Sequence, residues 1–327
     1  GGKKKKNVPG VDPHADELPW GAPDCADEDL PDGRIARQAI EALRESRDRP
    51  FFLAVGFRKP HLPFVAPKKY WDLYDPKDIR LASNPFPPKG APAFATNDSS
   101  ELRRYKGVAK EGPPVTDEEA RHLIHAYYAC VSYVDAQVGR LLDELDRLGL
   151  REKTVVIVWG DHGYQLGEHG TWNKRTNWEI ATRVPLMISV PGQKNRGKTT
   201  SALVEFVDIY PTLCELCQLP LPDGLEGTSF APLLENPDRP WKRAAFSIYQ
   251  KEIPGLGKGF GRAMRTDRYR LIEWSAPGSG KRIYELYDHQ TDPEENINIA
   301  DRPENRELVA SLAEQLRQGW KAALPPQ

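Results

Sequence analysis

The sequence lacks the features that would assign it at once to a membrane protein or a nucleic-acid-binding protein. No apolar run approaches the roughly 20 residues that a membrane-spanning helix needs, so we expect no membrane crossing. No charge of one sign dominates, because 46 basic and 47 acidic side chains give a formal net charge of −1. The whole chain is therefore not drawn to nucleic acid or to an anionic membrane, and any recognition that depends on charge must be local.

The beginning of the chain lacks an initiator methionine and an apolar signal core. We therefore expect that sequence upstream of Gly1 is not represented. The four lysines at 3–6 favour a solvated flexible strip over a binding patch. Cysteine is scarce too, and no second pair or histidine cluster completes the half zinc or redox motif of Cys214 and Cys217. These two cysteines are better interpreted as small apolar residues on a helix. The cysteines do not indicate whether the protein resides in an oxidising or a reducing compartment.

The first two thirds of the chain alternate between amphipathic segments and short apolar runs. Apolar stripes with helical spacing predict helices over 34–47, 117–148 and about 204–217. Short continuous apolar runs predict buried strands at 50–56, 154–159 and 185–190. This order is typical of an α/β sheet, with a long loop-rich stretch at 57–115.

From about residue 240 the pattern changes to short alternating strands that end in one polar helix. The strands are predicted at 243–249, 260–266, 268–274 and 281–287, and the helix at 304–323. Such an order indicates a small α+β subdomain. We therefore divide the chain into a loop-rich lead segment (1–33), an α/β part (34–238) and an antiparallel sheet with a helix (239–327).

The sharpest local motif is Gly160-Asp-His-Gly163, which follows the strand predicted at 154–159. Ligands gather at the carboxyl edge of an open α/β sheet, and the flanking glycines let a metal approach Asp161 and His162. A carboxylate beside an imidazole is half of a metal site. The alternative is an aspartate that caps a helix and a histidine held in a turn, which the two residues alone favour. Lys174 adds a point charge suited to sulfate or phosphate, although a single lysine usually lies on the surface.

A second motif, Gly56-Phe-Arg-Lys-Pro-His-Leu-Pro-Phe64, also follows a predicted strand. Pro60 and Pro63 restrict the backbone on both sides of His61 and so fix the direction of its ring. A fixed histidine at a sheet edge suits a general acid or base, but the motif alone favours a structural histidine in a rigid turn. His169 is a candidate for supporting the site without touching metal or substrate.

The remaining histidines carry less information. His14 and His289 lie in polar stretches and receive no role from the sequence, and His122 and His125 belong to the helix predicted at 117–148.

Several ordered motifs extend over nearly the whole chain after about residue 30. The most specific are Phe-Phe-Leu-Ala-Val-Gly-Phe-Arg-Lys-Pro-His-Leu-Pro-Phe (51–64), Tyr-Val-Asp-Ala-Gln-Val-Gly-Arg-Leu-Leu (133–142) and the segment from Asp161 to Lys174. Others lie at 203–213, 225–234 and 285–295. Together they resemble the sulfatase family of the alkaline-phosphatase-like superfamily, and within it the iduronate-2-sulfatase-like branch.

The resemblance implies an α/β fold with an alkaline-phosphatase-like mixed sheet flanked by helices, incomplete at the N-terminus, and a small C-terminal α+β subdomain. It implies a sulfuric ester hydrolase that depends on Ca²⁺ and formylglycine and is exo-acting on a sulfated sugar such as 2-O-sulfated uronate. Carried over by position, Asp161 and His162 match two metal ligands. Lys174 matches a lysine that contacts sulfate, and His61 matches the histidine beside the leaving oxygen. The family also implies export to the periplasm, the extracellular space or the lysosome.

One departure from the family pattern concerns the nucleophile. The family converts a cysteine or serine in a Cys-x-Pro-Ser-Arg type of motif to formylglycine, and none of the four cysteines here is followed by x-Pro-Ser-Arg. The family's Asp-Asp metal pair and the strand that carries it are missing too. We therefore expect an N-terminal truncation, a chain that is inactive alone, and the missing segment as its partner.

Two alternative functions stay open. One is a phosphodiesterase or phosphonate hydrolase on the same fold. The other is a non-catalytic protein that binds sulfated glycans.

Overall fold

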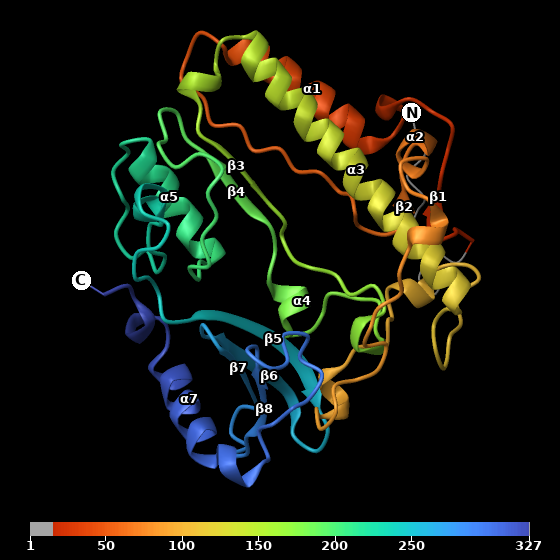
Figure 1. Cartoon of the computed structure of the whole chain (residues 1–327), viewed down its shortest axis with the longest axis vertical. Coiled ribbons are helices and arrows are strands. Elements are labelled where there is room, and N and C mark those ends of the chain that lie inside the picture. Colours follow the sequence, from red (N-terminus) through yellow and green to blue (C-terminus); the bar gives the residue numbers. More distant parts are fainter. Residues whose placement is uncertain (1–15, 327) are drawn as a thin grey trace. The chain divides into compact units, whose positions relative to one another are not determined.

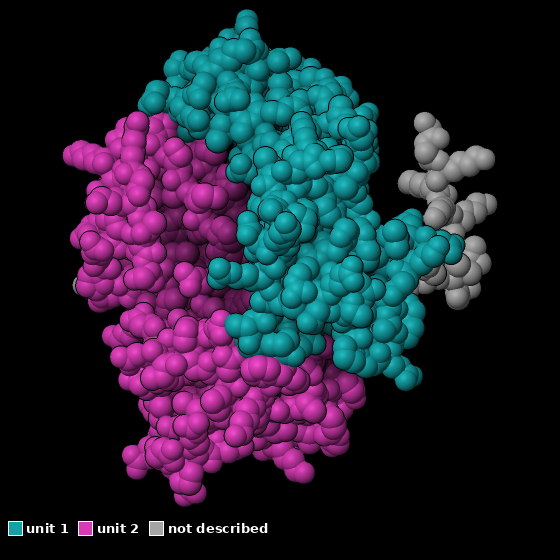
Figure 2. Space-filling model, turned by 45° about the vertical axis from the view of Figure 1, so that its right-hand side comes forward, with its two compact units in different colours: residues 1–85, 98–154, 166–173 teal, residues 86–97, 155–165, 174–327 magenta. Residues whose placement is uncertain are grey.

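The computed structural model describes residues 16–326, so the lysines at 3–6 and His14 lie outside the described residues. The chain divides into two compact units, which Figure 2 shows in different colours. Unit 1 comprises residues up to 85, 98–154 and 166–173, and unit 2 comprises 86–97, 155–165 and the residues from 174 on. Between residues 16 and 326, no helix is long and apolar enough to cross a membrane. The domain boundary at residue 238 stays a prediction.

Unit 1 is built on two packed helices, α1 (Pro31–Ser46) and α3 (Asp117–Arg147) (Figure 1). Helix α1 begins three residues before the predicted helix, because proline suits the first helical position, where no N–H partner is needed. Helix α3 begins with a capping box, in which the Thr116 hydroxyl accepts from Glu119 N at 3.3 Å and Glu119 accepts from Thr116 N at 2.7 Å. The prediction of a long helix over 117–148 is confirmed.

The buried face of α3 differs from the apolar stripe predicted for it. The helical spacing predicts that Ala129, Val131 and Leu145 share the buried face; Ala129 and Leu145 are buried, but Val131 is 45% exposed. The difference arises because polar contacts orient α3 against α1. Gly33 N donates to the Tyr133 hydroxyl at 2.6 Å, and the Arg44 guanidinium pairs with Glu144 at 2.8 Å. Hydrophobic periodicity does not register such contacts.

The other elements of unit 1 are short. Strand β1 (Trp20–Gly21) pairs in parallel with β2 (Phe64–Val65), and α2 (Lys68–Trp71) packs on α3. Single 3₁₀ turns occur at 27–29, 76–78, 102–104, 151–153 and 168–170. The buried strand predicted at 50–56 is wrong: residues 51–57 form no strand and Phe52 is 83% exposed. Within the described residues no neighbouring strand supplies the backbone hydrogen bonds that a buried strand requires.

Unit 2 contains the antiparallel sheet predicted for the C-terminal part. Its strands, in order, are β5 (Ala245–Ile253), β6 (Gly257–Arg265), β7 (Tyr269–Ser275) and β8 (Ile283–Asp288). Helix α7 (Arg306–Gln318) lies along the sheet (Figure 1) and buries Leu271 and Leu286 with its own apolar side chains. The next residue in each strand, Ile272 and Tyr287, points to the opposite face, as the period of two requires.

A smaller sheet in unit 2 pairs β3 (Val156–Trp159) antiparallel with β4 (Leu186–Ser189). Ile157, Leu186 and Ile188 pack against the cluster formed by α5 (Ile209–Leu216) and α6 (Ala231–Glu235). Both strands are thus confirmed, and the helix predicted over about 204–217 is present from residue 209 to 216, after a 3₁₀ turn at 206–208. Trp159 is 45% exposed and Met187 59% exposed, so these strands are covered on one face rather than buried on both.

A buried ion cluster joins the beginning of α5 to two other segments of unit 2. Lys242 Nζ donates to Glu205 Oε2 at 2.9 Å and to the two carboxylate oxygens of Asp208 at 2.7 and 2.8 Å. Asp208 also accepts from Thr228 N at 2.7 Å, and Glu205 accepts from Phe246 N at 2.9 Å. The three charged groups therefore hold a helix start, a loop and the first strand of the sheet together.

Candidate functional site

Asp161 and His162 stand directly beyond β3, where Gly160 N donates to Pro185 O at 3.1 Å. The Asp161 side chain is 86% exposed and that of His162 is 38% exposed. His162 N donates to Asp161 Oδ1 at 3.0 Å, and His162 Nε2 lies 3.6 Å from Asp161 Oδ2. The carboxylate and the imidazole are therefore close enough to bind one cation together.

The turn also sets the tautomer of His162. Its Nδ1 lies 2.8 Å from the carbonyl oxygen of Gly163, which only accepts, so Nδ1 carries the proton. In the neutral ring, Nε2 then keeps the lone pair that a metal ligand needs. Ca²⁺ takes about six to eight ligands, mostly oxygen atoms. One carboxylate and one imidazole therefore fit as part of a coordination sphere and do not complete it.

Gly163 permits this turn to pack closely on α4 (Glu179–Thr182). Gly163 N donates to Ala181 O at 2.9 Å, and a Cβ at this position would lie 1.8 Å from Ile180 O. A Cβ on Gly160, at the other end of the motif, would meet nothing closer than Val184 Cβ at 3.5 Å. The second glycine of the motif is thus required sterically, whereas the first is not.

We expect Gly163→Ala to lower the free energy of unfolding by about 1–3 kcal/mol, because the backbone must shift to admit the methyl group. Urea denaturation measures this effect, and the amide signals of Asp161 and His162 report the displacement. Gly160→Ala is the matched control and should change stability by less than about 1 kcal/mol, since its Cβ has ordinary van der Waals room. Equal effects of the two substitutions would contradict the steric argument.

Lys174 belongs to the same unit and precedes a segment that is anchored to the four-stranded sheet. Asn177 Nδ2 donates to Gly261 O at 2.9 Å, and Trp178 Nε1 donates to Glu285 Oε2 at 3.2 Å. A Cβ on Gly261 would lie 2.5 Å from Asn177 Nδ2, so glycine is needed for this contact. These contacts hold the backbone that follows Lys174.

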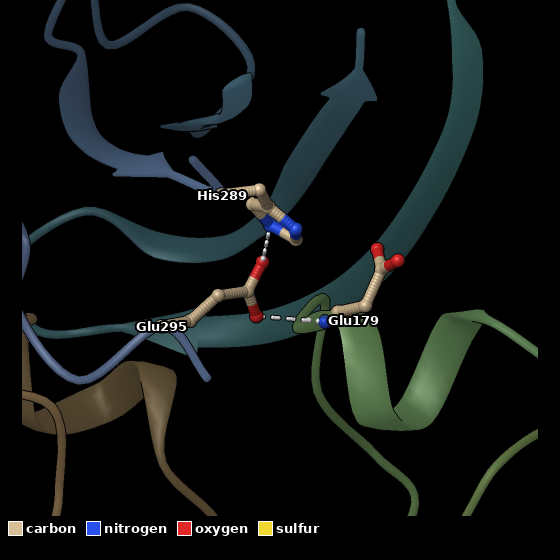
Figure 3. Close-up of side chains that lie close together, drawn as sticks. All are labelled: Glu179, His289 and Glu295. Carbon is tan, nitrogen blue, oxygen red and sulfur yellow. Dashed lines mark hydrogen bonds and ion pairs between the residues drawn. The ribbon is translucent and has the colours of Figure 1, made fainter. Parts of the chain in front are cut away.

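Glu179, His289 and Glu295 continue this anchor, and Figure 3 shows the three side chains together. His289 Nε2 lies 2.8 Å from Glu295 Oε1, and Glu179 N donates to Glu295 Oε2 at 2.7 Å. Arg270, which is 3% exposed, donates from Nε to Glu295 at 2.6 Å and also pairs with Glu179. Burial alone would raise the pKa of Glu295, but the Arg270 charge and the His289 hydrogen bond together lower it.

The spacing of these three side chains would also suit a metal ion, but arginine side chains already pair with the two carboxylates. Arg270 contacts both carboxylates, and Arg265 Nε lies 3.2 Å from Glu179 Oε2. Two arginines therefore already supply the positive charge that a cation would bring. We assign the cluster to holding the start of α4 on the sheet.

His61 belongs to unit 1, and α1 fixes the backbone of its motif. The Asp32 carboxylate, 1% exposed in the first turn of α1, accepts from Arg58 N at 3.0 Å and from Lys59 N at 2.9 Å. Lys59 Nζ donates to Pro63 O at 2.5 Å and to His61 O at 3.2 Å, which closes the turn. Burial lowers the pKa of Lys59. The rigid turn predicted around His61 is therefore present, although its restraints come from side chains as well as from the prolines.

A cavity of about 230 Å³ lies beside this turn in unit 1. Its lining residues are Leu30, Pro31, Asp32, Arg58, Lys59, His61, Leu62, Pro63 and Val65. The His61 side chain is 44% exposed. His61 therefore borders a hollow while it remains accessible to solvent.

His169 also belongs to unit 1 and is buried, with 3% of its surface exposed. Its backbone is in the left-handed region, with φ of 54°, and its N–H donates to Asn84 O at 2.8 Å. Its supporting role stays a prediction.

The structure thus brings Asp161 and His162 together and places Lys174 in the same unit, whereas His61 and His169 belong to the other unit. The catalytic and metal-binding roles of these residues stay predictions. Sequence reasoning missed their supporting residues. Asp32 was detectable, because proline followed by an acidic residue is a helix-start signal. His289 was set aside as a loop residue, but it lies against Glu295.

Two family profiles match this chain. The profile of the family described as Sulfatase matches residues 7–219, and that described as N-sulphoglucosamine sulphohydrolase, C-terminal, matches residues 167–322.

Several individual proteins are also similar to this chain. A sulfatase of Formosa agariphila is 33% identical over 90% of this chain and 54% of its own length. Iduronate 2-sulfatase of Homo sapiens is 36% identical over 86% of this chain and 64% of its own length. A phosphonate monoester hydrolase from Silicibacter pomeroyi shares the fold, with a TM-score of 0.75 at 24% identity over 92% of this chain and 62% of the other. The chain therefore spans between about half and two thirds of the length of these relatives.

Proposed function

The chain belongs to the sulfatase family, and from that premise we propose that it carries part of the active site of a sulfuric ester hydrolase that acts on a sulfated sugar. The observation that carries the proposal is the Asp161–His162 pair, in which the Nε2 lone pair of His162 and the exposed carboxylate of Asp161 lie 3.6 Å apart. Iduronate 2-sulfatase, to which the chain is 36% identical, suggests a 2-O-sulfated uronate as substrate and exo action. The same relationship suggests that the protein is exported.

Within this function each candidate residue has a separate task. Asp161 and His162 would hold a Ca²⁺ ion, which, when bound, neutralises negative charge at the sulfate group. Lys174, on its anchored segment, would bind a sulfate oxygen and stabilise the charge that develops there. His61 would donate a proton to the sugar oxygen that leaves sulfur. The family's nucleophile, formylglycine, arises from a motif that residues 1–327 do not contain.

The test is to fuse this chain to a family N-terminal segment that contains Cys-x-Pro-Ser-Arg and to co-express the fusion with the maturation enzyme. We expect Ca²⁺-dependent sulfate release from a 2-O-sulfated uronate disaccharide and from 4-nitrophenyl sulfate. Cysteine-to-alanine replacement in the fused motif is the control. No sulfate release by folded, formylglycine-bearing protein would contradict the proposal.

The same fusion distinguishes the alternatives. Faster hydrolysis of a phosphonate monoester or phosphodiester than of either sulfate ester would favour the phosphoryl-transfer enzymes of this fold. Binding of a sulfated oligosaccharide without turnover would favour a non-catalytic glycan-binding protein.

A further inference from the structure

Both ring nitrogens of His61 face oxygen atoms of unit 1. Nδ1 lies 2.7 Å from the carbonyl oxygen of Leu62, and Nε2 lies 3.0 Å from Oε1 of Glu101. A carbonyl oxygen and an ionised carboxylate accept hydrogen bonds and do not donate them. Both contacts are satisfied together only when both nitrogens carry protons, that is, when His61 is an imidazolium ion.

Glu101 is placed to hold this state. It is the N-cap residue of the 3₁₀ turn Leu102–Arg104, and its side chain is 18% exposed. Its charge is therefore less screened than that of an exposed carboxylate. An opposite charge within about 4–6 Å favours the charged form of a histidine.

The other charged groups around the His61 turn do not replace Glu101. Lys59 and Arg58 are cations that line the same cavity as His61, and the Lys59 ammonium donates to His61 O. Both cations therefore disfavour a positive charge on the His61 imidazole. Asp32 is the anion that lines this cavity, and its two carboxylate oxygens accept from Arg58 N and Lys59 N. Glu101, by contrast, contacts the imidazole directly, with its Oε1 3.0 Å from His61 Nε2.

We propose that Glu101 is a positioning residue that keeps His61 protonated and directs its Nε2–H before a substrate arrives. The consequence for catalysis rests on the proposed function. Substrate binding displaces the Nε2–H from Glu101 to the sugar oxygen, and as the ester S–O bond breaks its electron pair goes to that oxygen, which takes the Nε2 proton. The neutral His61 then regains a proton from water, and the nearby carboxylate favours this step.

The test follows the titration of His61 by NMR in the chain of residues 1–327, with His61→Gln to assign its signal. We expect Glu101→Gln to lower the pKa of His61 by at least about one unit, because the amide keeps the shape of the side chain and removes its charge. Glu111→Gln, which changes an exposed carboxylate elsewhere in unit 1, is the matched control and should leave the titration unchanged. The same His61 titration in Glu101→Gln as in the unchanged chain would overturn the proposal.

A second variant covers the case in which Glu101→Gln does not fold. Glu101→Asp retains the charge at a greater distance, so the pKa of His61 should fall by less than in Glu101→Gln but measurably below the unchanged chain. No change in Glu101→Asp would count against the proposal. These measurements need no turnover, so they stand apart from the sulfatase assay: a fusion that releases no sulfate would refute the proposed function and leave the Glu101–His61 pairing intact.

Discussion

Replacing Asp208 with alanine is expected to lower the free energy of unfolding by about 3–5 kcal/mol, because it leaves a buried ammonium group without most of its compensation. Lys242 is 7% exposed and Asp208 has no exposed surface. Two of the three contacts from Lys242 Nζ to carboxylate oxygens are to Asp208, and only the contact with Glu205 would remain. Urea denaturation followed by circular dichroism measures the loss.

The backbone hydrogen bonds of Asp208 account for part of this loss. Asp208 Oδ1 accepts from Thr228 N at 2.7 Å and Oδ2 accepts from Glu205 N at 2.8 Å, and both donors would lose their acceptor. Each unsatisfied buried donor costs about 1–3 kcal/mol. The loop that contains Thr228 packs closely on the residue before Asp208, because a Cβ on Gly227 would lie 1.8 Å from Val207 O.

Two further variants separate the charge from the volume. Asp208→Asn keeps the size and one acceptor, so we expect a loss smaller than that of Asp208→Ala but still above about 1 kcal/mol. Asp223→Ala, at an exposed aspartate of the same unit, should stay within about 0.5 kcal/mol of the unchanged chain. An Asp208→Ala loss of under 1 kcal/mol would show that the cluster contributes little to stability.

A sequence pattern predicts local structure but not contacts between residues that are distant in the sequence, as Asp208 illustrates. The strands of the C-terminal sheet were predictable, because β7 and β8 are short runs rich in apolar and aromatic residues that lie between turn residues. The position of Asp161 and His162 after a strand was predictable for the same reason. The Asp208–Lys242 contact joins residues 34 apart in the sequence, so no local pattern reveals it.

The wrong predictions, of a strand at 50–56 and of the buried face of α3, have a related cause. Residues 50–56 have the composition of a buried strand, but burial depends on neighbours that composition does not specify, and Phe52 is exposed. The stripe on α3 was misplaced because Tyr133 and Glu144 make the polar contacts that orient the helix. Glu101 had no local signal, since only the fold brings it to His61.

Lys174→Ala is expected to reduce the turnover of the fusion by about 10²–10³-fold, the effect of removing one preorganised group that stabilises transition-state charge. The reason for so large a loss lies in the anchor. Asn177 and Trp178 donate hydrogen bonds to residues of the sheet, and Glu179 N donates to Glu295, so the segment that follows Lys174 is held in place.

The control for this prediction is Lys198→Ala, which removes an exposed lysine from the same unit and should leave turnover unchanged. Lys174→Arg keeps the charge but replaces a compact ammonium with a planar fork, so we expect it to restore only part of the activity. Because the anchor of the segment consists of other residues, Lys174→Ala should change the free energy of unfolding by less than about 1 kcal/mol. A fall in turnover that merely followed a comparable loss of stability would assign Lys174 to the fold, and full activity in Lys174→Ala would remove it from the site.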